Sequence, residues 1–323
     1  MGRAFVRLLL DKTAELRDAH GIEWRLTGVA SRRLGWIAAP EGLDPEALLA
    51  GRFPAPAAQN VRAWLETARA DVLFEASSLN RHTGEPAIDH LKAALVAGAH
   101  AISANKGPIV YAYDELRRLA RDAGRLFLFE STVMDGTPVF SLFQHGLPAA
   151  ELRGFRGLLN STSNVVLTQM EAGLEFDAAV RKAQEIGVAE TDPSDDLDGW
   201  DPAVKVAALV IVLLGIPIRL DQVERIGVRG LDPATVRAAR AAGSPYKLIC
   251  RAERVGGGVL ASVRPEQVPL TDPLALLEGT TSCLEFDLDV FDLTVIEHKP
   301  GVVATAYGLL ADFIRAARED TGR

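Results

Sequence analysis

Short apolar runs with β-strand character alternate with helical patterns along the first 130 residues of the chain. The strand-like runs are residues 24–31, 71–77, 100–104 and 125–131. Helical patterns, such as those of residues 47–51 and 87–98, separate these runs. Strands that alternate with helices are typical of βαβ units and of a buried parallel sheet. The first 130 residues are therefore predicted to form a doubly wound, Rossmann-like α/β domain.

The chain opens on a helical pattern rather than on a strand. Residues 2–19 carry apolar side chains at helical spacing, and the pattern ends near His20 and Gly21. A dinucleotide-binding domain of this kind begins with a strand and a G-x-G-x-x-G turn, of which only the last glycine, Gly2, is present. Two interpretations are open. The natural start lies roughly a dozen residues upstream, or the domain has lost its first strand and cofactor loop.

The pattern changes after about residue 150. Strand-like runs occur at residues 155–160, 259–268, 283–290 and 293–298. They surround a helix that follows Pro202, which predicts a second α+β domain with a more antiparallel sheet. We therefore expect a nucleotide domain over residues 1–130, a substrate and dimerisation domain over 131–302, and a C-terminal helix over 303–323 that packs back on the first domain.

Composition limits the classes of function. The net charge is −8 with no basic stripe to offset it, which argues against a nucleic-acid-binding protein. The longest apolar run, residues 206–218, covers about 13 residues and is too short to cross a bilayer. The two cysteines, Cys250 and Cys283, form no metal or redox motif. We expect a cytoplasmic protein that acts on a small molecule and has no membrane or nucleic-acid partner.

A cluster of charge precedes the most apolar helix. Residues 190–205 read ETDPSDDLDGWDPAVK, which is six carboxylates followed by one lysine. Pro202 suits the first helical position and Asp201 the N-cap, so Lys205 can meet Asp201 four residues earlier. The residues that follow, 206–214, are apolar on every face and predict a buried helix. A lysine there needs an anion or a wet cavity, although a simple helix cap and a solvated acidic loop remain alternatives.

Several longer segments resemble homoserine dehydrogenase. They are GLLNSTSNVVLTQM (157–170), AQEIGVAETDPSDDLDGWDPAVK (183–205), SANKGPIV (103–110), PLALLEGTTSCLEF (273–286) and ATAYGLLADFI (304–314). The resemblance covers almost the whole chain and points to a short form without a kinase or regulatory domain. It implies NAD(P)-linked interconversion of L-homoserine and L-aspartate 4-semialdehyde, in threonine and methionine biosynthesis, by a homodimer.

The same resemblance assigns roles to residues of the acidic segment and its neighbours. Lys205 matches a lysine that protonates the aldehyde, and Asp201 matches the acid that orients its ammonium group. Lys106 matches a lysine at the junction of cofactor and substrate. The implied substrate-binding residues are Glu190, Asp196, Thr162 and Ser161. Ser161 stands where the family usually has a glycine, so a side chain is added where the backbone approaches a ligand.

Cofactor contacts are implied at many positions. They are Gly2, Ser31, Arg32, Arg33, Ser77, Ser78, Asn105, Lys106 and Gly301. Arg32 and Arg33 follow the run 24–31, where arginine suits a 2′-phosphate, so we expect NADP rather than NAD. A solvated surface loop is the alternative for these arginines. The family's glycine-rich turn corresponds here to IEHKPGVVATA (296–306), which keeps Gly301 and makes His298 and Lys299 uncertain neighbours of the cofactor.

The segment ESTVMDGTPVF (130–140) resembles a family loop that holds a monovalent cation such as Na⁺. The matching positions are Glu130, Val133, Asp135 and Thr137. A plain Asp-Gly turn leading into Pro138 explains the sequence nearly as well. Two other functions stay open for the whole chain. One is a related amino-acid dehydrogenase with another substrate, because Ser161 could reshape the pocket; the other is a non-catalytic homologue that has lost cofactor binding.

Overall fold

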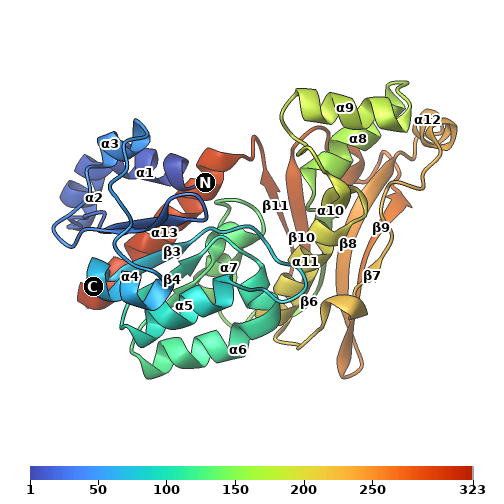
Figure 1. Ribbon diagram of the computed structural model, residues 1–323. Helices are drawn as coiled ribbons and strands as arrows, with labels where there is room; N and C mark the ends of the chain where they lie inside the picture. Colours follow the sequence, from blue (N-terminus) through green and yellow to red (C-terminus); the bar gives the residue numbers. More distant parts are fainter. Residues whose placement is uncertain (322–323) are drawn as a thin grey trace. The chain divides into compact units, whose positions relative to one another are not determined.

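The chain divides into two compact units in the computed structural model, which describes residues 1–321 (Figure 1). The first unit contains Met1–Pro138 and the C-terminal segment from Gly301 onward, and the second is Val139–Pro300. Residues 131–138 thus lie in the first unit, whereas the sequence suggested a boundary at residue 130. No helix within residues 1–321 is long and apolar enough to cross a membrane.

A parallel sheet organises the first unit. Its strands, in spatial order, are β3 (Val72–Glu75), β4 (His100–Ser103) and β5 (Phe127–Leu128). The crossover helices are α5 (Ala87–Val96) and α6 (Gly107–Asp122). All four residues of β4 are buried, as expected for the central strand of a covered sheet. The predicted Rossmann-like α/β architecture is confirmed for this part of the chain.

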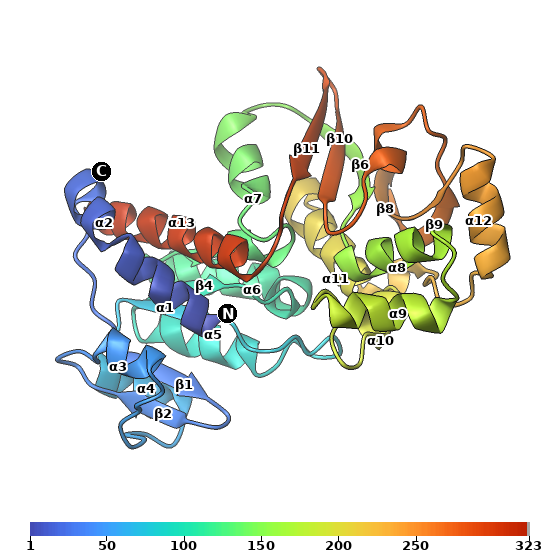
Figure 2. The same cartoon turned by 90° about the horizontal axis from the view of Figure 1, so that it is seen from above.

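The first strand-like run does not join that sheet. Within residues 24–31 only β1 (Gly28–Ser31) forms, and it pairs antiparallel with β2 (Gly35–Ala38) in a separate hairpin (Figure 2). Gly35 has a φ of +68°, which allows the chain to return after three residues. The hairpin packs on α4 (Val61–Ala68), where the Trp64 indole donates to the Ile37 carbonyl at 2.7 Å. The prediction of a fourth strand in the parallel sheet is therefore wrong.

Helices from the two ends of the chain pack together on the first unit. The predicted helix over residues 2–19 is broken at Lys12 into α1 (Gly2–Asp11) and α2 (Thr13–His20). The terminal helix α13 (Val302–Thr321) packs against α1. Phe5 of α1 meets Phe74 of β3 with ring centroids 4.4 Å apart, and Phe313 of α13 meets Phe74 with ring centroids 5.8 Å apart. This aromatic cluster forms part of the core of the unit.

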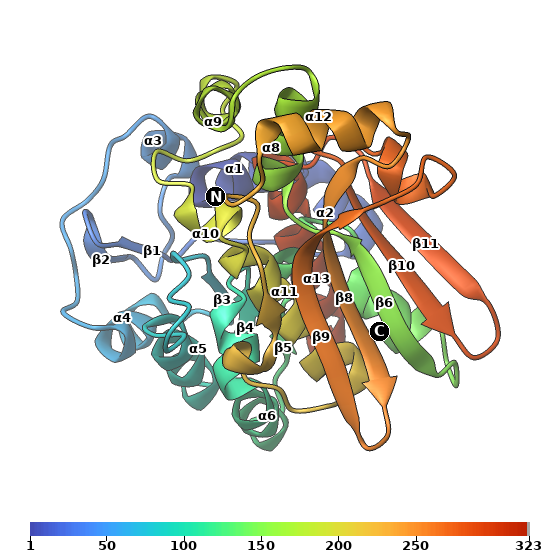
Figure 3. The same ribbon diagram turned by 90° about the vertical axis from the view of Figure 1, so that its right-hand side faces the viewer.

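A six-stranded sheet forms the second unit (Figure 3). Its order is β11 (Asp292–Glu297), β10 (Ser282–Leu288), β6 (Leu152–Leu158), β8 (Tyr246–Val255), β9 (Gly258–Gln267) and β7 (Glu224–Arg225). All neighbours are antiparallel except β7 and β9. Four of these strands were predicted and confirmed. The sequence pattern missed β8, because Lys247–Cys250 is buried on both faces and does not alternate.

The helices of this unit lie along one face and one end of the sheet (Figure 3). They are α7 (Val139–Ser141), α8 (Ser161–Glu171), α9 (Phe176–Glu185), α10 (Ser194–Leu197), α11 (Trp200–Leu209) and α12 (Pro233–Ala241). α11 packs against β8 and β9 and continues as a π-helical turn, Val210–Leu214. Val206–Val210 is completely buried, as predicted, whereas Ile211–Leu213 is partly exposed.

Candidate active site

The first turn of α11 sets the position of the predicted catalytic pair. The helix begins at Trp200, after Gly199 in the left-handed conformation with a φ of +81°. Asp201 and Pro202 are therefore the second and third helical residues, and the prediction of Asp201 as N-cap is wrong. Glycine permits the earlier start, and proline is tolerated throughout the first turn because its missing N–H would have no helical partner. The Asp201 carboxylate is consequently available to another group.

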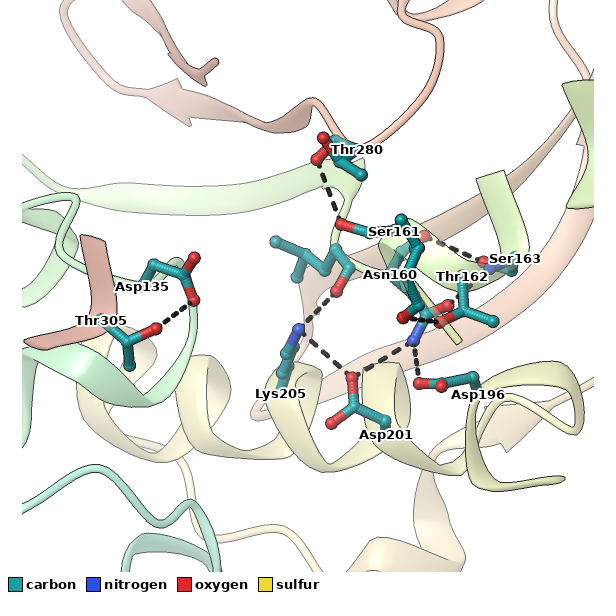
Figure 4. Close-up of polar contacts among 12 residues, drawn as sticks. Asp135, Asn160, Ser161, Thr162, Ser163, Asp196, Asp201, Lys205, Thr280 and Thr305 are labelled. Atoms are coloured by element: carbon teal, nitrogen blue, oxygen red, sulfur yellow. Dashed lines mark hydrogen bonds and ion pairs between the residues drawn. The ribbon is translucent and has the colours of Figure 1, made fainter. Parts of the chain in front are cut away.

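That group is Lys205. Its Nζ lies 3.2 Å from Asp201 Oδ2 and donates to the main-chain carbonyl of Leu159 at 2.6 Å (Figure 4). The pairing across four residues was predicted and is present. The side chains of Lys205 and Asp201 are 17% and 21% exposed, so their attraction is screened less than on an open surface. The ammonium is held in one position and still reaches solvent.

Asn160 links this pair to a second carboxylate. Its Nδ2 donates to Asp196 Oδ1 at 2.6 Å and to Asp201 Oδ2 at 3.3 Å. Its Oδ1 accepts from the Ser163 N–H at 2.8 Å, which makes Asn160 the N-cap of α8. Sequence reasoning missed this residue. An asparagine directly before a helical segment is nevertheless a recognisable N-cap signal.

Asp196 lies in a partly buried environment that disfavours its charge. Burial raises the pKa of Asp196, and the Asp201 charge raises it further; hydrogen bonds from Asn160 and Thr162 oppose this rise. We call Asn160, Thr162, Asp196, Asp201 and Lys205 the Lys205 cluster. Two carboxylates in this cluster share one amide donor, so the cluster offers negative charge that a cationic ligand would neutralise.

The other two predicted substrate residues, Ser161 and Glu190, are not part of the Lys205 cluster. The Ser161 hydroxyl, one residue after Asn160, donates to the Thr280 carbonyl at 3.1 Å. Glu190 lies in the loop between α9 and α10 with an exposed side chain. Its main-chain carbonyl accepts from the Gln184 side chain at 3.1 Å. Among residues 1–321, no described hydrogen bond or ion pair joins the Glu190 carboxylate to the Lys205 cluster.

The carboxyl end of the parallel sheet brings together several predicted cofactor residues. Asn105 Nδ2 donates to the carbonyls of Ser77 and Ser78 at 3.2 and 3.4 Å, and its Oδ1 accepts from the Gly107 N–H at 2.9 Å. Lys106 directly precedes the 16-residue helix α6. Exposed serines, a lysine and a helix N-terminus at this edge fit the polar groups of a dinucleotide.

The remaining predicted cofactor residues lie elsewhere in the first unit. Ser31, Arg32 and Arg33 are exposed at the turn of the β1–β2 hairpin, where the Ser31 hydroxyl accepts from the Leu34 N–H at 3.1 Å. Gly2 is exposed at the start of α1. These residues therefore do not follow a strand of the parallel sheet, which was the basis on which the arginines were assigned to the cofactor.

The predicted cation loop is fastened along α13. Asp135, with a φ of +45°, accepts from the Gly301 N–H at 2.5 Å and from the Thr305 hydroxyl at 3.0 Å (Figure 4). The N–H of buried Glu130 donates to Asp312 Oδ2 at 2.8 Å, and burial raises the pKa of Asp312 to about 7.

Two further residues of this loop were assigned to the cation. Val133 is buried, and the Thr137 N–H donates to the Met134 carbonyl at 2.8 Å, which closes a turn. Within residues 1–321, no group of three or more His, Cys, Asp or Glu side chains is placed to hold a metal ion.

Comparison with known proteins places both units in one family. The model of the homoserine dehydrogenase NAD-binding domain matches residues 1–130, and the homoserine dehydrogenase model matches residues 138–314. The NAD(+)-dependent homoserine dehydrogenase of Pseudomonas canavaninivorans is 34% identical over 99% of this chain and 94% of that protein. Homoserine dehydrogenase of Sulfurisphaera tokodaii is 31% identical over 99% of this chain and 96% of its own length.

Solved structures agree with this assignment. A homoserine dehydrogenase from Thiobacillus denitrificans has a TM-score of 0.86 and 27% identity, covering 99% of this chain and 72% of that one. A hyperthermophilic archaeal homoserine dehydrogenase in complex with NADPH has a TM-score of 0.82 and 26% identity, covering 98% and 94%. This chain therefore belongs to the homoserine dehydrogenase family and is an NAD(P)-dependent oxidoreductase.

Proposed function

We propose that the Lys205 cluster is the catalytic centre at which L-homoserine and L-aspartate 4-semialdehyde are interconverted. The observation that carries this proposal is the position of Lys205 Nζ between the Leu159 carbonyl and the Asp201 carboxylate. An ammonium held in this way is a proton donor of fixed direction that keeps contact with solvent. No other lysine of the second unit combines a carboxylate partner at this distance with partial burial.

Proton transfer is the part of the reaction that falls to Lys205. When bound, NAD(P)H supplies the hydride that reaches the carbonyl carbon. Lys205 polarises the carbonyl oxygen and delivers a proton from Nζ as that oxygen gains negative charge. Asp201 keeps Nζ oriented and stabilises its positive charge. In the oxidative direction Nζ first releases a proton to solvent at the partly exposed side chain, and the neutral amine then accepts the hydroxyl proton.

The substrate is recognised through its ammonium group. Asp196 supplies a carboxylate from inside the cluster, and Glu190 supplies one from the exposed loop that follows α9. Thr162 and Ser161 add hydroxyls at the first turn of α8. A bound ammonium would offset the repulsion between Asp196 and Asp201, which gives the site a physical reason to prefer an amino acid over its deaminated analogue.

Homoserine oxidation by the Lys205→Ala variant tests this centre. Loss of the proton donor should lower kcat by about 10²-fold or more, while NADP binding measured by calorimetry stays unchanged. Lys182→Ala is a matched control, because Lys182 is an exposed lysine of the same unit that pairs with Glu185 at 3.4 Å. Unchanged turnover in Lys205→Ala would refute the assigned role.

For the cofactor we propose NADP in preference to NAD. Its contacts are Gly2, Ser31, Arg32, Arg33, Ser77, Ser78, Asn105, Lys106 and Gly301, with Lys106 at the junction with the substrate. Support comes from the two exposed guanidinium groups on the hairpin turn, which suit a 2′-phosphate. One relative is named as NAD(+)-dependent, and the structure of another contains NADPH.

The preference is measured as the ratio of kcat/KM for the two cofactors. Replacing both Arg32 and Arg33 by serine should reduce the NADP-to-NAD ratio by about tenfold or more, because two phosphate contacts are lost. Arg62→Ser changes an exposed arginine elsewhere in the unit and should leave the ratio unchanged. An unaltered ratio in the double variant would favour the surface-loop interpretation.

Three further assignments complete the proposal. A monovalent cation such as Na⁺ binds the Glu130 carboxylate and main-chain carbonyls of Val133, Asp135 and Thr137. The protein forms a homodimer through the face of the six-stranded sheet that carries Leu260, which is 66% exposed. It acts in threonine and methionine biosynthesis in the cytoplasm, a setting that suits two free buried cysteines.

A further inference from the structure

A second lysine of the second unit is buried more deeply than Lys205. Lys247, on β8, is 1% exposed, and its Nζ donates to the Leu277 carbonyl at 2.6 Å and to Asn164 Oδ1 at 3.2 Å. The Asn164 amide in turn donates to the carbonyls of Leu277 and Gly279 at 3.3 and 2.9 Å. Lys247 and Asn164 together therefore hold the main chain of one short loop. This loop, residues 277–280, is called the 277–280 loop below.

The same loop is attached to the first turn of α8. The main-chain carbonyl of Thr280, at the end of the loop, accepts a hydrogen bond from the Ser161 hydroxyl at 3.1 Å. Arg156 fixes the flanks of the loop, because its guanidinium contacts Asp272 at 2.7 Å and Glu285 at 2.6 Å. With both flanks and three carbonyls restrained, the loop can move only if these hydrogen bonds break.

A buried lysine at position 247 carries a desolvation cost that a purely structural role does not require. Burial lowers the pKa of Lys247, which reports the cost of taking its charge out of water, while Glu171 and Glu278 act in the opposite direction. Its direct hydrogen-bond partners are neutral oxygens. A buried apolar side chain of similar volume would avoid the desolvation cost and often stabilises a fold more than a buried charge does. Lysine at this position therefore makes most sense as a means of placing the loop.

We propose that Lys247 is a positioning residue for substrate binding, acting through the 277–280 loop on the first turn of α8. Lys247 holds the loop in place, and the loop holds Ser161 through its hydrogen bond to Thr280. Thr162, the next residue, is thereby held as well. This inference rests on the proposed function, which assigns those two hydroxyls to the substrate. The hydrogen bond from the Ser161 hydroxyl to the Thr280 carbonyl is the attachment that joins the loop to α8.

Steady-state kinetics of Lys247→Met and Ser161→Ala test the proposal. Lys247→Met should raise the homoserine KM about tenfold, because the loop loses the hydrogen bond from Lys247 and the two from Asn164, which Lys247 holds in place. Ser161→Ala should raise it about threefold, because only the hydrogen bond to Thr280 is lost. In Lys247→Met, kcat and the KM for NADP should change less than about threefold, since Lys247 touches neither the substrate nor the transferred proton. Arg254→Met is the matched control. Arg254 is also a cation of β8 that donates to two main-chain carbonyls, those of Leu152 and Leu214.

A double-mutant cycle separates positioning from general destabilisation. If Lys247 and Ser161 hold the same loop, their effects on the homoserine KM should be non-additive, whereas Ser161→Ala and Arg254→Met should be additive. Equal KM increases in Lys247→Met and Arg254→Met would overturn the proposal, as would additivity of Lys247→Met with Ser161→Ala. If Lys247→Met fails to fold, an unchanged KM in Ser161→Ala overturns it on its own. Because Lys205→Ala reports on kcat and this series on KM, the two proposals can fail separately.

Discussion

Two lysines of the second unit each donate to a main-chain carbonyl at 2.6 Å, but their surroundings differ. Lys205 also has a carboxylate, that of Asp201, at 3.2 Å, and its side chain is 17% exposed. Lys247 has the neutral amide oxygen of Asn164 as its second partner and is 1% exposed. The first lysine keeps its charge beside an anion and within reach of water. The second is removed from water, and its hydrogen bonds hold the 277–280 loop.

The difference shows how one side chain can serve two purposes. A lysine that transfers protons needs a stabilised ammonium and a route by which the proton is replaced. A lysine that positions a loop needs fixed geometry and gains nothing from solvent. The same substitution at each position should therefore change different kinetic constants, and this contrast supports three predictions in order of expected size.

The largest effect is expected from methionine at the two lysine positions. Lys205→Met should lower kcat by about 10²-fold or more with a modest change in homoserine KM. Lys247→Met should instead raise that KM while kcat stays within about threefold. Both are measured from initial rates of NADP reduction over a range of homoserine concentrations. The comparison fails if the two variants lose the same kinetic constant.

A smaller effect is expected from Asp201→Asn. The variant keeps a side chain of the same shape but loses the charge that holds Lys205, so kcat should fall by about tenfold. Asp198→Asn is the control, because Asp198 lies three residues earlier and pairs with Arg229 rather than with Lys205. Turnover measured at saturating homoserine should be nearly normal in the control. Equal losses in the two variants would argue against an orienting role for Asp201.

The smallest effect is a change in stability at Asp196. Because burial raises the pKa of this carboxyl, the folded state holds the proton to higher pH than the unfolded chain does. The free energy of unfolding therefore falls as pH rises from the unfolded pKa through the folded one. Asp196→Asn removes that loss, so the Tm of the variant should exceed that of wild type at neutral pH. The two should converge below about pH 3, where both states of the wild type are protonated.

Asp192, two residues before α10, offers a control in which the pKa shift has the opposite sign. Hydrogen bonds from Ser194 lower the pKa of Asp192, so Asp192 contributes stability that is present above its unfolded pKa and lost as pH falls. Asp192→Asn should therefore not raise the Tm at neutral pH. Scanning calorimetry across the acid range distinguishes the two, and a Tm gain in both variants would contradict the explanation based on buried charge. The homoserine KM should rise only in Asp196→Asn.

Local patterns predicted most of the architecture and part of the site. The parallel strands β3, β4 and β5 were recognisable because buried strands between helices have a distinctive apolar signature. The run at residues 24–31 was misplaced in that sheet, because its partner is chosen by the turn at Gly35 and by packing on Trp64. The strand β8 was missed because burial on both faces removes the alternation by which a strand is recognised.

What the sequence alone determined is the local part of the chemistry. A spacing of four residues in a helix brings Lys205 to Asp201 whatever the rest of the chain does. The tertiary structure decided the remainder. Asn160 reaches Asp196 and Asp201 across 36 and 41 residues, and Lys247 reaches Asn164 across 83. Contacts over such separations depend on how α8 packs against α10 and β8, and no local pattern specifies that packing.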